Sequence, residues 1–146
     1  MVLTDGDIEV ALGRLALFCQ AAWSKETSAD PAHWSYENSA WGQCAVTALV
    51  VERFFGVEII RLDLSRAPDP SIAALRSHYF NRIRGRMFDL TESQFPRTQF
   101  YKDLLERGAI TARDKKELFA APNTRKRYEL LLAEITRMNG DDIVIN

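Results

Sequence analysis

The sequence predicts an α+β protein in which a buried helix that begins at a cysteine packs on a small antiparallel sheet. Three observations predict it: an apolar run over residues 43–55, a β-hairpin pattern over 78–91, and helical spacing of apolar residues at both ends of the chain. With 146 residues, of which 47% are hydrophobic, we expect a single domain over 1–146. Its core should span 42–95, and a helical segment should follow over 97–139.

The chain starts with a predicted helix over residues 6–23. Thr4 and Asp7 have the spacing of a helix-capping pair. Apolar residues then recur every three or four positions, at Ile8, Ala11, Leu12, Leu15, Cys19 and Ala22. Cys19 lies on this apolar stripe, so we interpret it as a core residue.

An irregular loop is predicted over residues 24–40, because this stretch is rich in Ser, Asp and Asn and contains a proline. Loops that lead into a nucleophile often form one wall of its pocket. Trp34, Tyr36 and Trp41 therefore either line a substrate groove or cover the core. The loop also carries His33, one of the two histidines in the chain.

The apolar run over residues 43–55 covers nearly every side of a helical wheel, which predicts a buried helix. Gly56 provides a helix C-cap, and residues 57–64 have the composition of a strand. Cys44 lies in the first turn of the helix. Free amide hydrogens and the positive end of the helix dipole stabilise a thiolate at such a position.

A hairpin is predicted from residues 78–83 and 86–91, joined by Arg84 and Gly85, after a surface connection over 66–77 that contains a helical turn at 71–76. With a two-residue turn, Ile83 faces Arg86. That register places His78 and Asp89 on one face as diagonal neighbours, within hydrogen-bonding reach. A three-residue turn would place the two side chains on opposite faces.

The last third of the chain predicts three helices, over 98–107, 111–120 and from 123 or 124 to 138. Their apolar residues should pack on the core: Leu104, Leu105, Leu118, Phe119, Tyr128, Leu131, Leu132 and Ile135. Basic residues near 113–116 and 125–127 alternate with acidic ones, which is typical of a solvated helix surface. The tail, 140–146, adds an edge strand or packs on a partner.

Cys44, His78 and Asp89 together offer a nucleophile, a base and a carboxylate that orients the base. The backbone amide of Cys44 is a natural donor to an oxyanion, and a second donor would be the side-chain amide of Gln43 or Asn38. His33 is an alternative base. A metal site is not expected, because the chain lacks closely spaced ligand pairs such as CxxC or HxxxH.

The motifs GQCAVTALVV (42–51) and HYFNRIRGRMFDLT (78–91) resemble the Cys, His and Asp core of the papain-like and transglutaminase-like superfamily. Together with DLTESQF (89–95), they are also similar to the YunG family of uncharacterised bacterial proteins. The resemblance implies a papain-like fold. It also implies that Cys44 is the nucleophile, His78 the base and Asp89 the orienting carboxylate.

These observations lead to the hypothesis of a thiol-dependent hydrolase or acyltransferase that acts on a peptide, amide or acyl substrate through a thioester on Cys44, without a cofactor. The alternative is an inactive papain-like scaffold that binds or regulates a protein partner. A net charge of −1 gives no general attraction to nucleic acid or anionic membranes. No apolar run approaches about 20 residues and the acidic N-terminus lacks a secretion signal, so we expect a cytoplasmic location.

Overall fold

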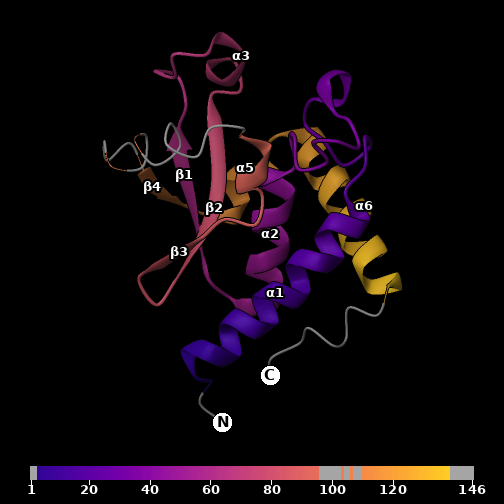
Figure 1. Cartoon of the computed structure of the whole chain (residues 1–146), viewed down its shortest axis with the longest axis vertical. Coiled ribbons are helices and arrows are strands. Elements are labelled where there is room, and N and C mark those ends of the chain that lie inside the picture. The colour runs from indigo at the N-terminus through magenta and orange to yellow at the C-terminus, as the bar shows by residue number, and fades with distance from the viewer. Residues whose placement is uncertain (1–2, 96–102, 104–105, 107–109, 139–146) are drawn as a thin grey trace.

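A four-stranded antiparallel sheet packs against a central helix in the computed structural model, which describes residues 3–95, 103, 106 and 110–138 (Figure 1). The strand order is β3-β2-β1-β4. The strands are β1 (Glu58–Asp63), β2 (Ser77–Ile83), β3 (Arg86–Phe88) and β4 (Ile110–Arg113). Helix α2 (Cys44–Phe55) lies between the sheet and the helices α1 (Asp5–Ala22) and α6 (Pro122–Arg137) (Figure 1). The predicted α+β class is confirmed.

Helix α1 begins at the predicted capping pair. Thr4 Oγ1 accepts from the Asp7 amide at 3.0 Å, and Asp7 Oδ2 accepts from the Thr4 amide at 2.9 Å. The predicted apolar stripe faces the core, and Cys19 on it is fully buried. Within the part of the chain that the structure describes, no helix is long and apolar enough to cross a membrane.

Helix α2 starts at Cys44 and ends before Gly56, whose φ of 65° forms a left-handed cap. Every residue from 46 to 51 is buried, as the apolar run predicted. This burial on all sides follows from the position of the helix between two layers, because a helix covered by a sheet and by other helices has no solvent face.

The hairpin between β2 and β3 has the predicted register. Ile83 pairs with Arg86 and Asn81 pairs with Phe88. Arg84 and Gly85 both have positive φ, 51° and 79°, which is the backbone of a type I′ two-residue turn. This turn fixes which residues of the two strands share a face.

The region after residue 95 differs from the prediction at one element. The predicted helix over 111–120 is wrong over residues 111–113, because they belong to β4, which pairs with β1. The unpaired edge of β1 offers backbone hydrogen bonds that outweigh local helix propensity. Only α5 (Lys115–Phe119), capped by Asp114, is helical there. The helix predicted to start at 123 or 124 is confirmed as α6.

The helix predicted over 98–107 falls largely on residues that are not described, and the tail over 140–146 lies outside the described residues. The surface connection after β1 contains the predicted helical turn as α3 (Pro70–Ala73). Two short 3-10 turns complete the described elements, η1 (Pro31–His33) and η2 (Glu92–Gln94).

The loop over 24–43 is pinned to the chain just before α2. Ser28 Oγ donates to the Trp41 carbonyl at 2.8 Å, and the Ala29 amide donates to the Gly42 carbonyl at 2.8 Å. Gly42 has φ 73°, and a Cβ at this position would lie 2.3 Å from Ser28 Oγ and 2.9 Å from the Ala29 nitrogen. Only glycine satisfies both the backbone angle and the close approach.

We predict that Gly42→Ala lowers the free energy of unfolding by about 3 kcal/mol, because it adds a steric clash to the cost of a left-handed backbone. Gly56→Ala is the matched control, since Gly56 has φ 65° but no atom within 4 Å of the added Cβ. Its expected loss is about 1 kcal/mol. Urea unfolding measures both, and equal losses would contradict a steric role for Gly42.

Candidate active site

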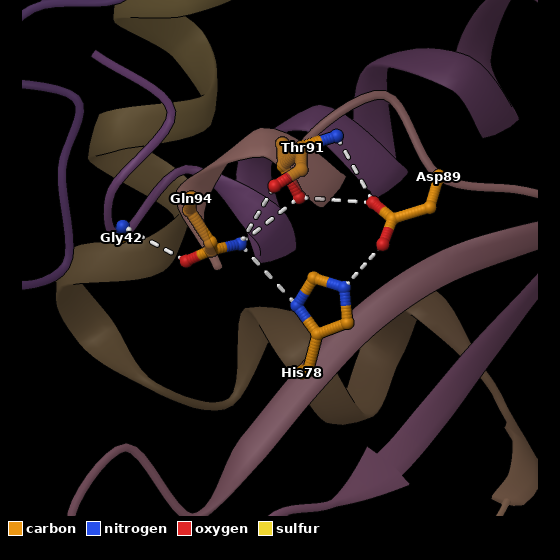
Figure 2. Close-up of polar contacts among 5 residues, drawn as sticks. All are labelled: Gly42, His78, Asp89, Thr91 and Gln94. Atoms are coloured by element: carbon orange, nitrogen blue, oxygen red, sulfur yellow. Dashed lines mark hydrogen bonds and ion pairs between the residues drawn. The ribbon is translucent and has the colours of Figure 1, made fainter. Parts of the chain in front are cut away.

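His78 and Asp89 form a buried pair, and the His78 ring packs against Phe80 and Phe95. His78 Nε2 lies 2.6 Å from Asp89 Oδ2 (Figure 2). The side chains are 1% and 7% exposed. The contact that the hairpin register predicted is therefore present, and solvent hardly reaches it.

Asp89 lies one residue beyond the end of β3 and is held by Thr91. The Thr91 amide donates to Asp89 Oδ1 at 3.0 Å, and the Thr91 hydroxyl donates to the same oxygen at 3.1 Å (Figure 2). Such a turn fixes the carboxylate rotamer through local hydrogen bonds. Because Oδ1 is bound to Thr91, Oδ2 is presented to the imidazole.

Cys44 is the first residue of α2, and its side chain is partly exposed. Cys44 is close enough to His78 to raise the pKa of the imidazole. The imidazole itself contacts Asp89 through Nε2. The predicted nucleophile and the predicted carboxylate therefore both act on His78.

Two opposing effects act on the pKa of His78. Burial lowers the pKa of His78. The charge of Asp89 and the hydrogen bond to Asp89 together raise it by more than burial lowers it, and Cys44 makes a smaller contribution in the same direction. The net result is a pKa of about 10 instead of 6.5. At neutral pH the site therefore holds an imidazolium next to the Cys44 sulfur, which is the charge state that supports a thiolate.

Gln94 is a part of the site to which the sequence analysis gave no role. Its Nε2 donates to the Thr91 carbonyl at 3.2 Å and to Thr91 Oγ1 at 3.1 Å, and lies 3.4 Å from His78 Nδ1 (Figure 2). Its Oε1 accepts from the Gly42 amide at 3.4 Å. The signal was available, because Gln94 belongs to the DLTESQF motif, but it does not reveal which group the amide contacts.

Thr91 sets the orientation of the Gln94 side-chain amide. The Thr91 carbonyl and Thr91 Oγ1 both accept from Gln94 Nε2, so the nitrogen end of the amide faces the imidazole. The imidazole therefore has Asp89 beside Nε2 and the Gln94 amide nitrogen beside Nδ1.

The two candidates for a second oxyanion donor have different surroundings. Gln43 is fully buried, donates from Nε2 to the Ser24 carbonyl at 2.9 Å and accepts from Thr27 Oγ1 at 2.8 Å. Both ends of its amide therefore brace the loop. Asn38 is half-buried and donates one hydrogen of Nδ2 to the Gln94 carbonyl at 3.1 Å, so its second hydrogen remains to be used.

The loop residues divide between two cavities. Trp41, Asn38 and His33 line a cavity of about 610 Å³ that reaches α3. Trp34 and Tyr36 line a different one, of about 680 Å³, beside the end of α1 and α6. His33 is exposed, and its Nδ1 contacts Asp30 at 2.8 Å, so the structure pairs it with Asp30. Among the described residues, no cluster of three or more His, Cys, Asp or Glu is placed to hold a metal ion.

The geometry defines an α+β protein with a partly exposed cysteine at the start of its central helix and a buried histidine–carboxylate pair beside it. A model of the family described as YunG protein matches residues 11–139, so the chain belongs to the YunG family. It is similar to the uncharacterized protein YunG of Bacillus subtilis (strain 168), with 32% identity over 74 residues. That alignment covers 51% of this chain and 54% of the relative, about half of each. No solved structure matches.

The raised pKa of His78 predicts how stability depends on pH. A raised pKa in the folded state stabilises the protein fully below the unfolded value of 6.5, and this stabilisation is lost as the pH rises toward about 10. In a Cys44→Ser background, which removes the thiol, we expect the free energy of unfolding to fall by on the order of 3 kcal/mol over this range.

The control is Asp89→Asn in the same background. It removes the charge that raises the pKa but leaves every other titrating group in place. The difference in the free energy of unfolding between Cys44→Ser and the double variant should shrink as the pH rises. A difference that stays constant from pH 6 to 10 would show that the pair does not hold the proton.

Proposed function

We propose that this protein is a thiol-dependent hydrolase or acyltransferase with a papain-like arrangement of Cys44, His78 and Asp89, which acts on a peptide, amide or other acyl bond. The observation that carries the proposal is the contact of the His78 imidazole with Asp89, together with the neighbouring Cys44, which raises the pKa of that imidazole. The resemblance of its motifs to the papain-like and transglutaminase-like superfamily supports the same roles.

In the first step the Cys44 sulfur, whose proton His78 already holds, attacks the acyl carbonyl carbon. The carbonyl oxygen gains a negative charge, which the Cys44 amide and Asn38 Nδ2 stabilise. The tetrahedral intermediate collapses as the bond to the leaving group breaks. His78 returns its proton to the leaving amine or alcohol, and a thioester on Cys44 remains.

In the second step water or an amine attacks the thioester carbonyl and gives its proton to His78. The carbon–sulfur bond breaks, and the proton stays on His78, which restores the starting charge state. Attack by water makes the protein a peptidase or amidase, and attack by an amine makes it a transglutaminase-like acyltransferase.

Asp89 and Gln94 act in this scheme as positioning residues. Asp89 keeps the imidazole charged and oriented through Nε2. Gln94 connects the loop before α2, through the Gly42 amide, to the strand-end turn that holds Asp89. The distance between nucleophile and base is therefore set by contacts between segments about 50 residues apart, Gly42 and Gln94.

We predict that iodoacetamide modifies Cys44 much faster than Cys19, because Cys19 is fully buried and burial raises the pKa of its thiol to about 12. His78→Ala should slow the modification of Cys44 by about 10-fold or more, since it removes the imidazolium. Peptide mass spectrometry of timed samples measures both rates.

The chain supplies a matched control in its other histidine, His33, which is exposed and pairs with Asp30. His33→Ala should leave the rate unchanged. If His33→Ala slowed the reaction and His78→Ala did not, the assignment of the base would be wrong. Equal modification of both cysteines would refute an activated Cys44.

We predict that Asn38→Ala lowers the rate of acylation of Cys44 by p-nitrophenyl acetate about 100-fold, the usual effect of removing one oxyanion donor. Modification by iodoacetamide forms no oxyanion, so its rate should remain nearly that of the wild type. A fall in both rates would instead indicate a structural role for Asn38. Rapid alkylation of wild-type Cys44 with no acylation by any ester or amide would favour an inactive scaffold that binds a protein partner.

A further inference from the structure

Arg127 lies on the face of α6 that packs into the protein. The buried residues of this helix, Thr124, Leu131 and Ile135, are spaced at three- and four-residue intervals around it. Arg127 falls into the same series, three residues after Thr124 and four before Leu131. The fold therefore directs a charged side chain inward from the C-terminal helix.

The guanidinium of Arg127 has few partners inside the protein. One Nη donates to Thr124 Oγ1 at 3.2 Å, and the buried Nε has no hydrogen-bond partner. Among the described residues, no carboxylate forms an ion pair with it. The carboxylates on neighbouring elements pair elsewhere, Glu52 with Lys115 at 3.6 Å and Asp89 with His78.

Arg127 is within electrostatic range of Cys44. Burial lowers the pKa of Arg127, and the charge of Cys44 opposes that effect. The packing agrees, because α6 lies against α2 (Figure 1). Tyr128 follows Arg127 in sequence, and Ala45 follows Cys44. Both Tyr128 and Ala45 pack on one buried cluster around Ala48 and Leu49.

A partly buried guanidinium whose Nε has no partner gains stability when an anion arrives with the ligand. Its planar array of donors matches a carboxylate in a two-point contact. We propose that Arg127 binds a carboxylate on the acyl group that Cys44 attacks, so that the substrates of this protein are acyl compounds with an acidic substituent near the reacting carbonyl. This inference rests on the proposed function, because it concerns the same nucleophile.

Two reagents of equal size and chemistry test the inference. Iodoacetate carries a carboxylate and iodoacetamide a neutral amide, and both alkylate the Cys44 sulfur with loss of iodide. We expect the ratio of their rates, iodoacetate over iodoacetamide, to fall about 10-fold in Arg127→Gln, because a nearby positive charge attracts only the first reagent. The matched control is Lys126→Gln, which removes an exposed charge from the adjacent position of α6.

The ratio should stay at the wild-type value in Lys126→Gln and take an intermediate value in Arg127→Lys, which keeps the charge and loses the two-point contact. Arg127→Lys also provides the test if Arg127→Gln does not fold. Equal slowing of both reagents in the Arg127 variants would mean that the arginine acts on the sulfur alone, and would overturn the inference. An equal fall of the ratio in Lys126→Gln would overturn it as well.

Alkylation needs no turnover, so the two proposals fail separately. If Arg127 favours iodoacetate but Cys44 never forms a thioester, the proposed enzymatic function is refuted and the anion site at Arg127 is supported. A protein that is acylated at Cys44 but whose ratio does not depend on Arg127 would refute only the acidic substrate.

Discussion

The structure depends on a charged pair placed inside the core. The imidazole of His78 and the carboxylate of Asp89 are both withdrawn from water, and each ion requires the other to offset the cost of burial. The contact requires that β2 and β3 pair in one register, since a shift by one residue moves His78 and Asp89 to opposite faces. The two-residue turn at Arg84 and Gly85 is consequently a constraint on the site as well as on the sheet.

A second constraint fixes Cys44 relative to that pair. The loop over 24–41 encloses Gly42 and Gln43, the two residues before Cys44. The Gln43 side chain forms hydrogen bonds with Ser24 and Thr27 of this loop. Gln94 then joins the Gly42 amide to the turn that carries Asp89. A buried amide is stable when all of its donors and acceptors have partners, and the partners of Gln43 and Gln94 connect the start of α2 to the loop and to the hairpin. The site is therefore held by hydrogen bonds on both sides of the imidazole.

Sequence patterns predicted the elements that carry strong periodicity or turn chemistry: the capped helix α1, the buried helix α2, the hairpin and its register, and α6. The pairing of His78 with Asp89 followed from strand alternation alone. β4 was not predicted because its pairing partner, β1, lies about 50 residues earlier in the chain. A local sequence pattern does not show that a distant strand has a free edge. The role of Gln94 and the burial of the Gln43 amide were missed for the same reason, since both depend on contacts with loops.

Arg127 places a partly buried positive charge on α6, the helix that packs against α2. The sequence placed residues 125–127 on a solvated face, and Arg125 and Lys126 are exposed, but Arg127 is turned toward α2. His78 and Asp89 nearly cancel each other's charge, so Arg127 and the start of α2 give the surroundings of Cys44 a net positive character. The proposed role of Arg127 follows from these charges, because an acyl group that carries a carboxylate supplies the counter-ion that the guanidinium does not find among the described residues.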